Sequence, residues 1–311
     1  MSTVRRRLAF FGSPAWAVPV LEALARAHDV VLVVTQPDKP KGRGLKTQPS
    51  PVAQAAERLG LEVVKPRRLR RDPEIAERLR ALDLDAAVVA AYGQIIPEAL
   101  LQIPRYGFLN IHPSLLPKYR GAAPVNWALI HGEPETGVSI MRLDAGMDTG
   151  PVFVQERTPI GPGETAVELS ERLRDRGVAL LLDVLERLET ARPEPQTGEP
   201  SYAPLLGKED GRIRWNEPAR KVYDRHRGVQ PWPGSWFEHG GKRVKVLEMR
   251  PVDGRGRPGE VLEVGPEGVR VATGEGAVEL ITVQPEGKRP MPAADWARGH
   301  GVAPGVRLGG G

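Results

Sequence analysis

The stretch "FLNIHPSLLPKYRGAAPVNWAL", residues 108–129, begins as a strand and then changes character. Side chains alternate along a strand, so Asn110 and His112 share one face, and the leucine and isoleucine beside them share the other. Pro113 cannot donate a hydrogen bond to a neighbouring strand and therefore ends regular pairing. The sequence predicts a strand with one apolar face and a polar pair at its carboxyl end.

Four earlier apolar runs, each followed by a segment of helical periodicity, precede this strand, at residues 7–12, 29–36, 61–64 and 85–93. This alternation predicts an α/β domain of Rossmann-like type, with a doubly wound, mostly parallel sheet and helices on both faces. Ligands of such sheets bind beyond the carboxyl ends of the strands. The polar pair at the end of the fifth strand is therefore in a suitable place for a site.

A proline-rich segment at residues 190–207 has neither helical nor alternating periodicity, which is typical of a stiff linker. A helical pattern and five short alternating runs follow it and predict a smaller antiparallel barrel of OB-like type. The predicted organisation is an α/β domain at 1–189, a linker at 190–207 and a smaller OB-like domain at 208–311.

Composition restricts the class of protein. The chain has 311 residues, a net charge of +5 and no cysteine, so disulfides and thiolate metal sites are excluded. Its apolar runs are too short for a membrane helix. We expect a cytoplasmic protein. Basic residues are in excess at 65–80 and at 208–250, which favours a phosphate-bearing partner, and the alternative is the solvated surface of an arginine-rich protein.

A second polar cluster, "DAGMDTG", occupies residues 144–150 between two strand-like runs. Its glycines and aspartates are typical of a turn, in which Asp144 and Asp148 would bind their own backbone. The alternative is a carboxylate beside His112, which would fix the tautomer of the imidazole and stabilise its charged form. Spacing alone does not decide between the two.

The run from Asn110 to Leu129, followed by Asp148 in "DAGMDTGP", resembles the folate-dependent formyltransferases. The segment "FFGSPAWAVPVLEAL", the loop "TQPDKPKGRGLKTQPSPVAQ" and the basic C-terminal part extend the resemblance over essentially the whole chain. It implies transfer of the formyl group of 10-formyltetrahydrofolate to the α-amino group of methionyl initiator tRNA. The product would be N-formylmethionyl-tRNA for translation initiation.

The resemblance also implies roles for individual residues. The catalytic set would be Asn110, His112 and Asp148, and the folate site would be lined by Ser114, Leu115, Leu116 and Pro117. Contacts to tRNA would come from a basic loop and from the C-terminal domain, through Lys39, Lys41, Arg43, Lys46, Arg212, Arg214, Lys242, Arg243 and Lys245. The family suggests a monomer with neither a metal nor a permanently bound cofactor.

Two alternatives remain at this point. Another transferase that uses 10-formyltetrahydrofolate, acting on an amino sugar or on a purine-pathway amine, would share the same three polar residues. An RNA-binding protein without enzymatic activity would leave those residues unexplained. Trp232 and Trp236 of the C-terminal part could stack on bases, but their proline- and glycine-rich setting favours positions in the core.

Overall fold

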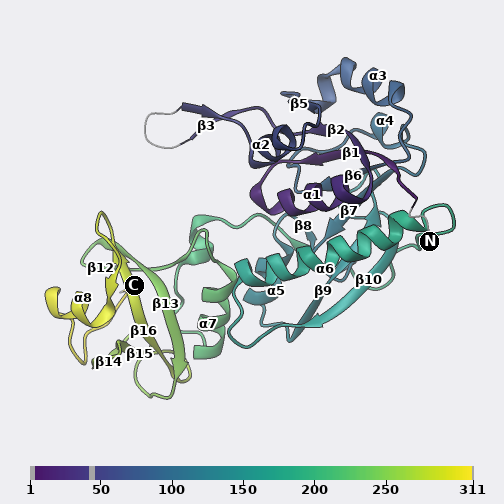
Figure 1. Cartoon of the computed structure of the whole chain (residues 1–311). Helices are drawn as coiled ribbons and strands as arrows, with labels where there is room; N and C mark the ends of the chain where they lie inside the picture. Colours follow the sequence, from purple (N-terminus) through teal and green to yellow (C-terminus); the bar gives the residue numbers. More distant parts are fainter. Residues whose placement is uncertain (1–3, 42–45, 310–311) are drawn as a thin grey trace. The chain divides into compact units, whose positions relative to one another are not determined.

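The computed structural model describes residues 4–41 and 46–309 of the chain. The contacts divide the chain into two compact units, whose elements are labelled in Figure 1. Unit 1 consists of the residues up to Gly121 together with Glu135–Pro159 and Ser170–Tyr202. Unit 2 consists of Ala122–Pro134, Ile160–Leu169 and the residues from Ala203 onward. Two short internal segments therefore fold with the C-terminal part of the chain.

Within the described residues, unit 1 contains a seven-stranded sheet. Its strands are β1 (Arg7–Gly12), β2 (Asp29–Val34), β5 (Val63–Val64), β6 (Ala86–Ala90), β7 (Phe108–His112), β9 (Glu135–Arg142) and β10 (Val152–Pro159). The order is β10-β9-β7-β6-β1-β2-β5. The five strands from β7 to β5 run parallel to one another, and β9 is antiparallel to both of its neighbours, β7 and β10. The predicted doubly wound, mostly parallel sheet is confirmed.

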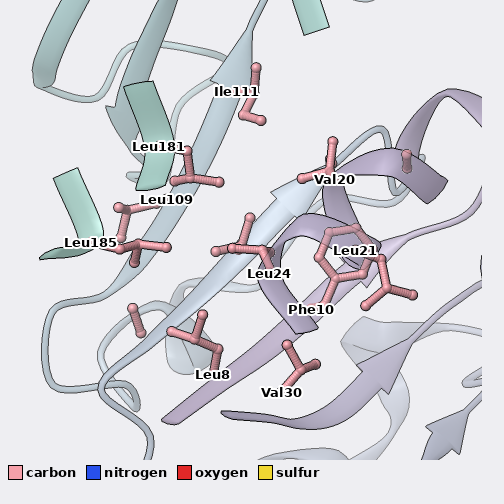
Figure 2. Close-up of a cluster of buried hydrophobic side chains, with 14 of the residues drawn as sticks. Leu8, Phe10, Val20, Leu21, Leu24, Val30, Leu109, Ile111, Leu181 and Leu185 are labelled. Carbon is pink, nitrogen blue, oxygen red and sulfur yellow. The ribbon is translucent and has the colours of Figure 1, made fainter. Parts of the chain in front are cut away.

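Helices cover both faces of this sheet. One face packs in a single apolar cluster with α1 (Val18–Ala27), α2 (Pro51–Arg58) and α6 (Ala166–Glu186). The other face packs with α3 (Pro73–Ala81) and α4 (Glu98–Leu101). Figure 2 shows Leu109 of β7 beside Leu181 and Leu185 of α6, all of them buried. The apolar side of β7 therefore anchors the strand in the core and leaves Asn110 and His112 on the opposite face.

The proline-rich segment that follows α6 is bonded to unit 1 rather than left free. Glu194 and Val152 exchange two backbone hydrogen bonds, of 2.9 and 2.8 Å. The backbone carbonyl of Ser201 accepts from the amide of Arg120 at 2.8 Å. Because proline lacks an N–H, the backbone hydrogen bonds of this segment to unit 1 are made by its other residues. This pairing brings residues 194–201 next to the segment that follows β7.

Several shorter elements complete the chain. The basic loop of residues 39–48 includes a two-stranded antiparallel ribbon, visible as β3 in Figure 1. The short elements are η1 (Ala15–Ala17), β3 (Lys39–Lys41), β4 (Lys46–Gln48), η2 (Leu69–Arg71), β8 (Arg120–Gly121), α5 (Pro124–Ile130), β11 (Tyr202–Ala203), η3 (Lys208–Gly211), β17 (Met291–Pro292) and α8 (Ala293–Gly299). In the described part of the chain no helix is long and apolar enough to cross a membrane.

Unit 2 is centred on a second, antiparallel sheet. Its main strands are β12 (Ser235–His239), β13 (Lys242–Val252), β14 (Val261–Val264), β15 (Val269–Ala272) and β16 (Ala277–Pro285), in the order β12-β13-β16-β15-β14. Each neighbouring pair is antiparallel, as the sequence predicts. The helix α7 (Ala219–Gly228) contributes Ala219 and Val222 to the apolar core of this sheet. Closure into an OB-like barrel remains a prediction.

One buried histidine of unit 2 should make stability depend on pH. His226 of α7 is buried, with Nδ1 2.9 Å from Ser235 Oγ, and burial lowers its pKa from 6.5 to about 4. As the pH falls, the imidazole of His226 therefore takes up a proton in the unfolded chain before it does so in the folded chain. The stability that the neutral, buried His226 provides is fully present above pH 6.5 and is lost as the pH falls from there toward 4.

We expect the unfolding midpoint to drop between pH 7 and pH 5, by more in the wild type than in His226→Gln. In this window the titration of one histidine lowers the free energy of unfolding by at most about 1.4 kcal/mol for each unit by which the pH falls. Thermal unfolding of both proteins at four pH values measures the difference. Equal slopes would mean that His226 does not titrate as its burial implies.

Candidate active site

The site begins with the polar pair at the end of β7. Leu109 and Ile111 are buried in the apolar cluster beneath α6, which fixes the strand. Asn110 is half-buried, and its side-chain amide forms no hydrogen bond to any other described residue. His112 is 4% exposed. The strand thus presents one amide that is open to a ligand and one imidazole that is held by its surroundings.

Both nitrogens of His112 face oxygen atoms that act as acceptors. Nε2 lies 2.9 Å from the backbone carbonyl oxygen of Tyr119, and Nδ1 lies 3.6 Å from Oδ2 of Asp148. A carbonyl oxygen can only accept, so Nε2 carries a hydrogen and donates a hydrogen bond to Tyr119. Nδ1 is therefore the ring nitrogen that faces the carboxylate.

Asp148 reaches His112 from the turn between β9 and β10. Its Oδ2 also accepts a hydrogen bond of 2.7 Å from the backbone amide of Gly121. Its φ is +54°, a conformation uncommon for residues other than glycine but more frequent for aspartate. Gly150 is required nearby, because a Cβ there would lie 1.8 Å from the backbone oxygen of Arg142. The amide of Gly121 therefore holds the carboxylate beside His112.

The two aspartates of the turn have different surroundings. Oδ1 of Asp144 accepts from the amide of Gly146 at 3.0 Å and from the hydroxyl of Thr149 at 2.6 Å. Asp144 thus binds its own turn, whereas Asp148 faces the imidazole. Of the two interpretations that the sequence left open, each applies to one of the two residues.

The four residues expected to line a folate site form a tight turn after β7. The hydroxyl of Ser114 donates to the carbonyl of Lys118 at 2.6 Å, so its polar atom is used within the segment. Leu116 is buried, and the carbonyls of Ser114 and Leu116 accept from Ser139 Oγ at 2.6 Å and from Gln155 Nε2 at 2.8 Å. The turn is therefore preformed, supported by side chains from β9 and β10.

Sequence reasoning missed these supporting residues. Ser139 and Gln155 lie on strands that the sequence indicates only as strand-like runs, and their bonds to the turn span 23 to 39 residues. Gln196 was also missed, because it lies in the proline-rich segment where no periodicity points to a contact. A motif shows which residue types lie near one another in the sequence. It does not show the distant residues that folding brings into contact with them.

The residues expected to bind tRNA divide into two groups. In the basic loop, Lys39 is exposed, and Arg43 lies outside the described residues. Lys41 and Lys46 pair with each other in the ribbon of β3 and β4. In unit 2, Arg212, Arg214, Lys242 and Lys245 are exposed and Arg243 is half-buried.

The basic residues of unit 2 gather partly around one tryptophan. The guanidinium carbon of Arg243 lies 3.9 Å from the ring centre of Trp236, and that of Arg212 lies 5.4 Å from it. Lys245 is the cross-strand partner of Trp236. Arg214, by contrast, lies 3.7 Å from Glu217, and Lys242 pairs with His239 at the strand's end. Three of the five predicted residues therefore share one surface.

The two tryptophans differ from each other. Trp236 is 2% exposed, as a core position requires, although it is covered by arginine side chains rather than by the apolar cluster. Trp232 is 56% exposed, so the prediction of a core position is wrong for it. Trp232 lies in a turn between α7 and β12, and proline and glycine are common in such turns, so composition does not decide its burial. No group of three residues able to hold a metal ion occurs in the described part of the chain.

Comparison with known proteins gives a consistent result. Residues 6–185 match a family model described as formyl transferase, and residues 205–301 match one described as formyl transferase, C-terminal domain. A methionyl-tRNA formyltransferase from Thermus thermophilus is 63% identical over 303 residues, which is 97% of this chain and 99% of that protein.

Solved structures with a related fold are more distant in sequence. An N-formyltransferase from Helicobacter canadensis, in complex with folinic acid and dTDP-3-aminofucose, aligns with a TM-score of 0.67 at 19% identity, over 89% of this chain and 99% of that one. HypX from Aquifex aeolicus, in complex with tetrahydrofolic acid, aligns with a TM-score of 0.64 at 20% identity, over 94% of this chain and 46% of that one. At these identities the alignments establish the fold alone.

Proposed function

The chain belongs to the formyl transferase family, and we infer that it transfers the formyl group of 10-formyltetrahydrofolate to the α-amino group of methionyl initiator tRNA. The product is N-formylmethionyl-tRNA for translation initiation. The observation that carries this conclusion is the 63% identity, over nearly the full length, to a relative named for methionyl-tRNA. The same observation makes an RNA-binding protein without enzymatic activity the weaker hypothesis.

The amino-sugar and purine-amine alternatives have less support. The sugar enzyme that resembles this chain in fold is only 19% identical to it. The present chain also matches the formyl transferase C-terminal model over residues 205–301, and that part carries a basic surface around Trp236. A basic surface suits a tRNA, because the phosphate backbone supplies most of the affinity for nucleic acid.

For the chemical step we propose that His112 moves the proton, with Asp148 as its charge partner. The amine must be neutral to attack the formyl carbon, and it becomes positively charged once the new C–N bond has formed. Transfer requires that this nitrogen lose a proton and that the folate nitrogen gain one as its own bond to the formyl carbon breaks. Nδ1 of His112 can take up the first proton and deliver the second. The carboxylate 3.6 Å away stabilises the charged intermediate form of the imidazole.

Asn110 has a separate role in this proposal. Attack on the formyl carbon leaves a negative charge on the formyl oxygen, which preorganised donors stabilise. The side-chain amide of Asn110 shares the face of β7 with His112 and is not engaged by other described side chains. It can therefore donate to the oxygen together with the Nδ1–H of the protonated His112. Formation of a covalent intermediate on the enzyme is not needed, because the formyl group passes directly between two nitrogens.

The folate co-substrate would bind against Ser114, Leu115, Leu116 and Pro117. Ser139 and Gln155 hold the backbone of this turn in place, and a lining that is ordered in advance loses little entropy on binding. Since the polar atom of Ser114 is already bonded, we propose that this segment contributes shape and apolar surface. No metal or resident cofactor enters the reaction as proposed.

Basic residues would bind the tRNA, with Arg43 of the loop as the main contact to the acceptor end. We expect Arg43→Ala to raise the KM for methionyl-tRNA and leave the KM for the folate unchanged. Removal of one phosphate contact should also reduce the slope of log affinity against log salt by about one. Kinetics at several salt concentrations test this, with Arg187→Ala, at an exposed arginine just after the end of α6, as the matched control. Identical salt dependence in both variants would refute the assignment.

The protein is proposed to act as a monomer in the cytoplasm. All three catalytic residues come from one chain and from unit 1 alone, so the site does not need a second copy. The activity itself is tested by formylation of methionyl-tRNA with and without 10-formyltetrahydrofolate, beside an amino sugar nucleotide and a purine-pathway amine as competing acceptors. Product from an amino sugar or purine amine, with none from methionyl-tRNA, would refute the proposed function.

A further inference from the structure

Gln196 lies in the proline-rich segment, far from the catalytic residues in sequence, yet its side chain is fully engaged beside them. Nε2 donates to the backbone oxygens of Asp148, at 2.7 Å, and of Gly150, at 2.8 Å. Oε1 accepts from Nη2 of Arg120 at 2.7 Å and from Nε at 3.1 Å. Both N–H groups and the oxygen of this amide are therefore used, which no other side chain of similar length could do.

These bonds join the two chain segments that hold His112. One segment contains Tyr119, whose carbonyl accepts from Nε2, and Gly121, whose amide donates to Asp148. The other is the turn that carries Asp148. Arg120 belongs to the first segment and the two carbonyls to the second, so Gln196 bridges them. The backbone pairing of Glu194 with Val152 fixes where this bridge is built.

The bridge supports the turn at Asp148, which has an uncommon backbone conformation. Asp148 adopts a positive φ of 54°, and such a conformation persists only where surrounding contacts hold it. Within the turn, Asp144 accepts hydrogen bonds from Gly146 and Thr149. Asp148 itself is tied from outside the turn, by Gln196 and by the amide of Gly121.

We propose that Gln196, together with Arg120, is a positioning residue that holds the carboxylate of Asp148 toward Nδ1 of His112. This inference rests on the proposed roles of His112 and Asp148. Without the bridge the turn keeps its other bonds, so the fold persists while the carboxylate loses its fixed direction. The loss should therefore fall on the chemical step and spare the binding of either substrate.

The test is the full-length protein with Gln196→Met, which has similar size and lacks the amide. We expect kcat to fall about tenfold or more, since small misplacements of catalytic groups have effects of this order. The KM values for methionyl-tRNA and for the folate should stay within about twofold, because Gln196 and Arg120 are not among the residues assigned to the binding of either substrate. Gln102→Met, at an exposed glutamine of unit 1, is the matched control and should behave as the wild type.

A second variant covers a possible failure to fold. Gln196→Glu keeps the acceptor for Arg120 but sets a carboxylate against two carbonyl oxygens, so it should lower kcat by at least as much as Gln196→Met. Wild-type kcat in a folded Gln196 variant, or a change in KM alone, would overturn the inference.

The variant Asp148→Asn separates this inference from the proposed function. If Asp148→Asn retains full activity, the proposed catalytic set is wrong, whatever Gln196 does. If Asp148→Asn is impaired and the Gln196 variants are not, only the positioning role fails. In the double variant, Gln196→Met should have little further effect, because its contribution passes through Asp148. Losses that multiply in the double variant would overturn the positioning role.

Discussion

His112→Ala should lower the rate of formyl transfer by roughly 10³-fold, because general acid–base groups typically contribute about 10² to 10⁴. The variant lacks Nδ1, the nitrogen that faces Asp148, so it should no longer pass the proton of the amine to the folate nitrogen. The affinity for 10-formyltetrahydrofolate should change little, since the turn of residues 114–117 is held by Ser139 and Gln155. Single-turnover formylation with both substrates saturating measures the chemical step directly.

The control for this variant is His300→Ala. His300 is an exposed histidine at the end of α8 and lies in unit 2. The unfolding midpoints of both variants should be compared with the wild type, because His112 is buried and its loss leaves a cavity. A folded His112→Ala enzyme with ordinary single-turnover rates would contradict the role of this residue.

Asn110→Ala should lower the same rate by about 10² to 10³, the usual effect of losing one oxyanion donor. Asn110→Asp is expected to lose at least as much, because a carboxylate would repel the charge on the formyl oxygen. The two variants differ in size and share the missing donor, so similar losses point to the hydrogen bond rather than to packing. The measurement is again the single-turnover rate, with equilibrium binding of the folate as a parallel readout.

Asn216→Ala serves as the matched control, since Asn216 is exposed and belongs to unit 2. The pH dependence of Asn110→Ala should keep the shape found for the wild type, because an amide does not titrate. A loss confined to the KM of the folate would show that Asn110 binds the ground state and not the developing charge.

Local patterns in the sequence were sufficient for much of the fold. The alternation of apolar runs and helical segments predicts the parallel sheet, and the confirmed strand Phe108–His112 has its apolar pair against α6 as the alternation requires. The five short runs after residue 230 correspond to β12 to β16. These features depend on periodicity within a few residues, which is what a sequence records directly.

The remaining features depend on contacts between distant residues. Nothing in the spacing of Asp144 and Asp148 tells which one reaches His112, because that choice depends on the turn's backbone and on Gly121. Gln196 lies 48 residues from Asp148 in a segment without periodicity. Trp232 is 56% exposed, whereas Trp236, four residues further on, is buried. Each of these depends on tertiary geometry rather than on a local pattern.

His112 and Asp148 are proposed to act as one unit in formyl transfer. A double-mutant cycle with His112→Ala and Asp148→Asn, measured as single-turnover formylation of methionyl-tRNA, tests it most directly. If Asp148 acts through His112, the double variant should be as slow as His112→Ala alone, within about threefold. If the two losses multiply, the carboxylate and the imidazole work independently, and they do not form a catalytic unit.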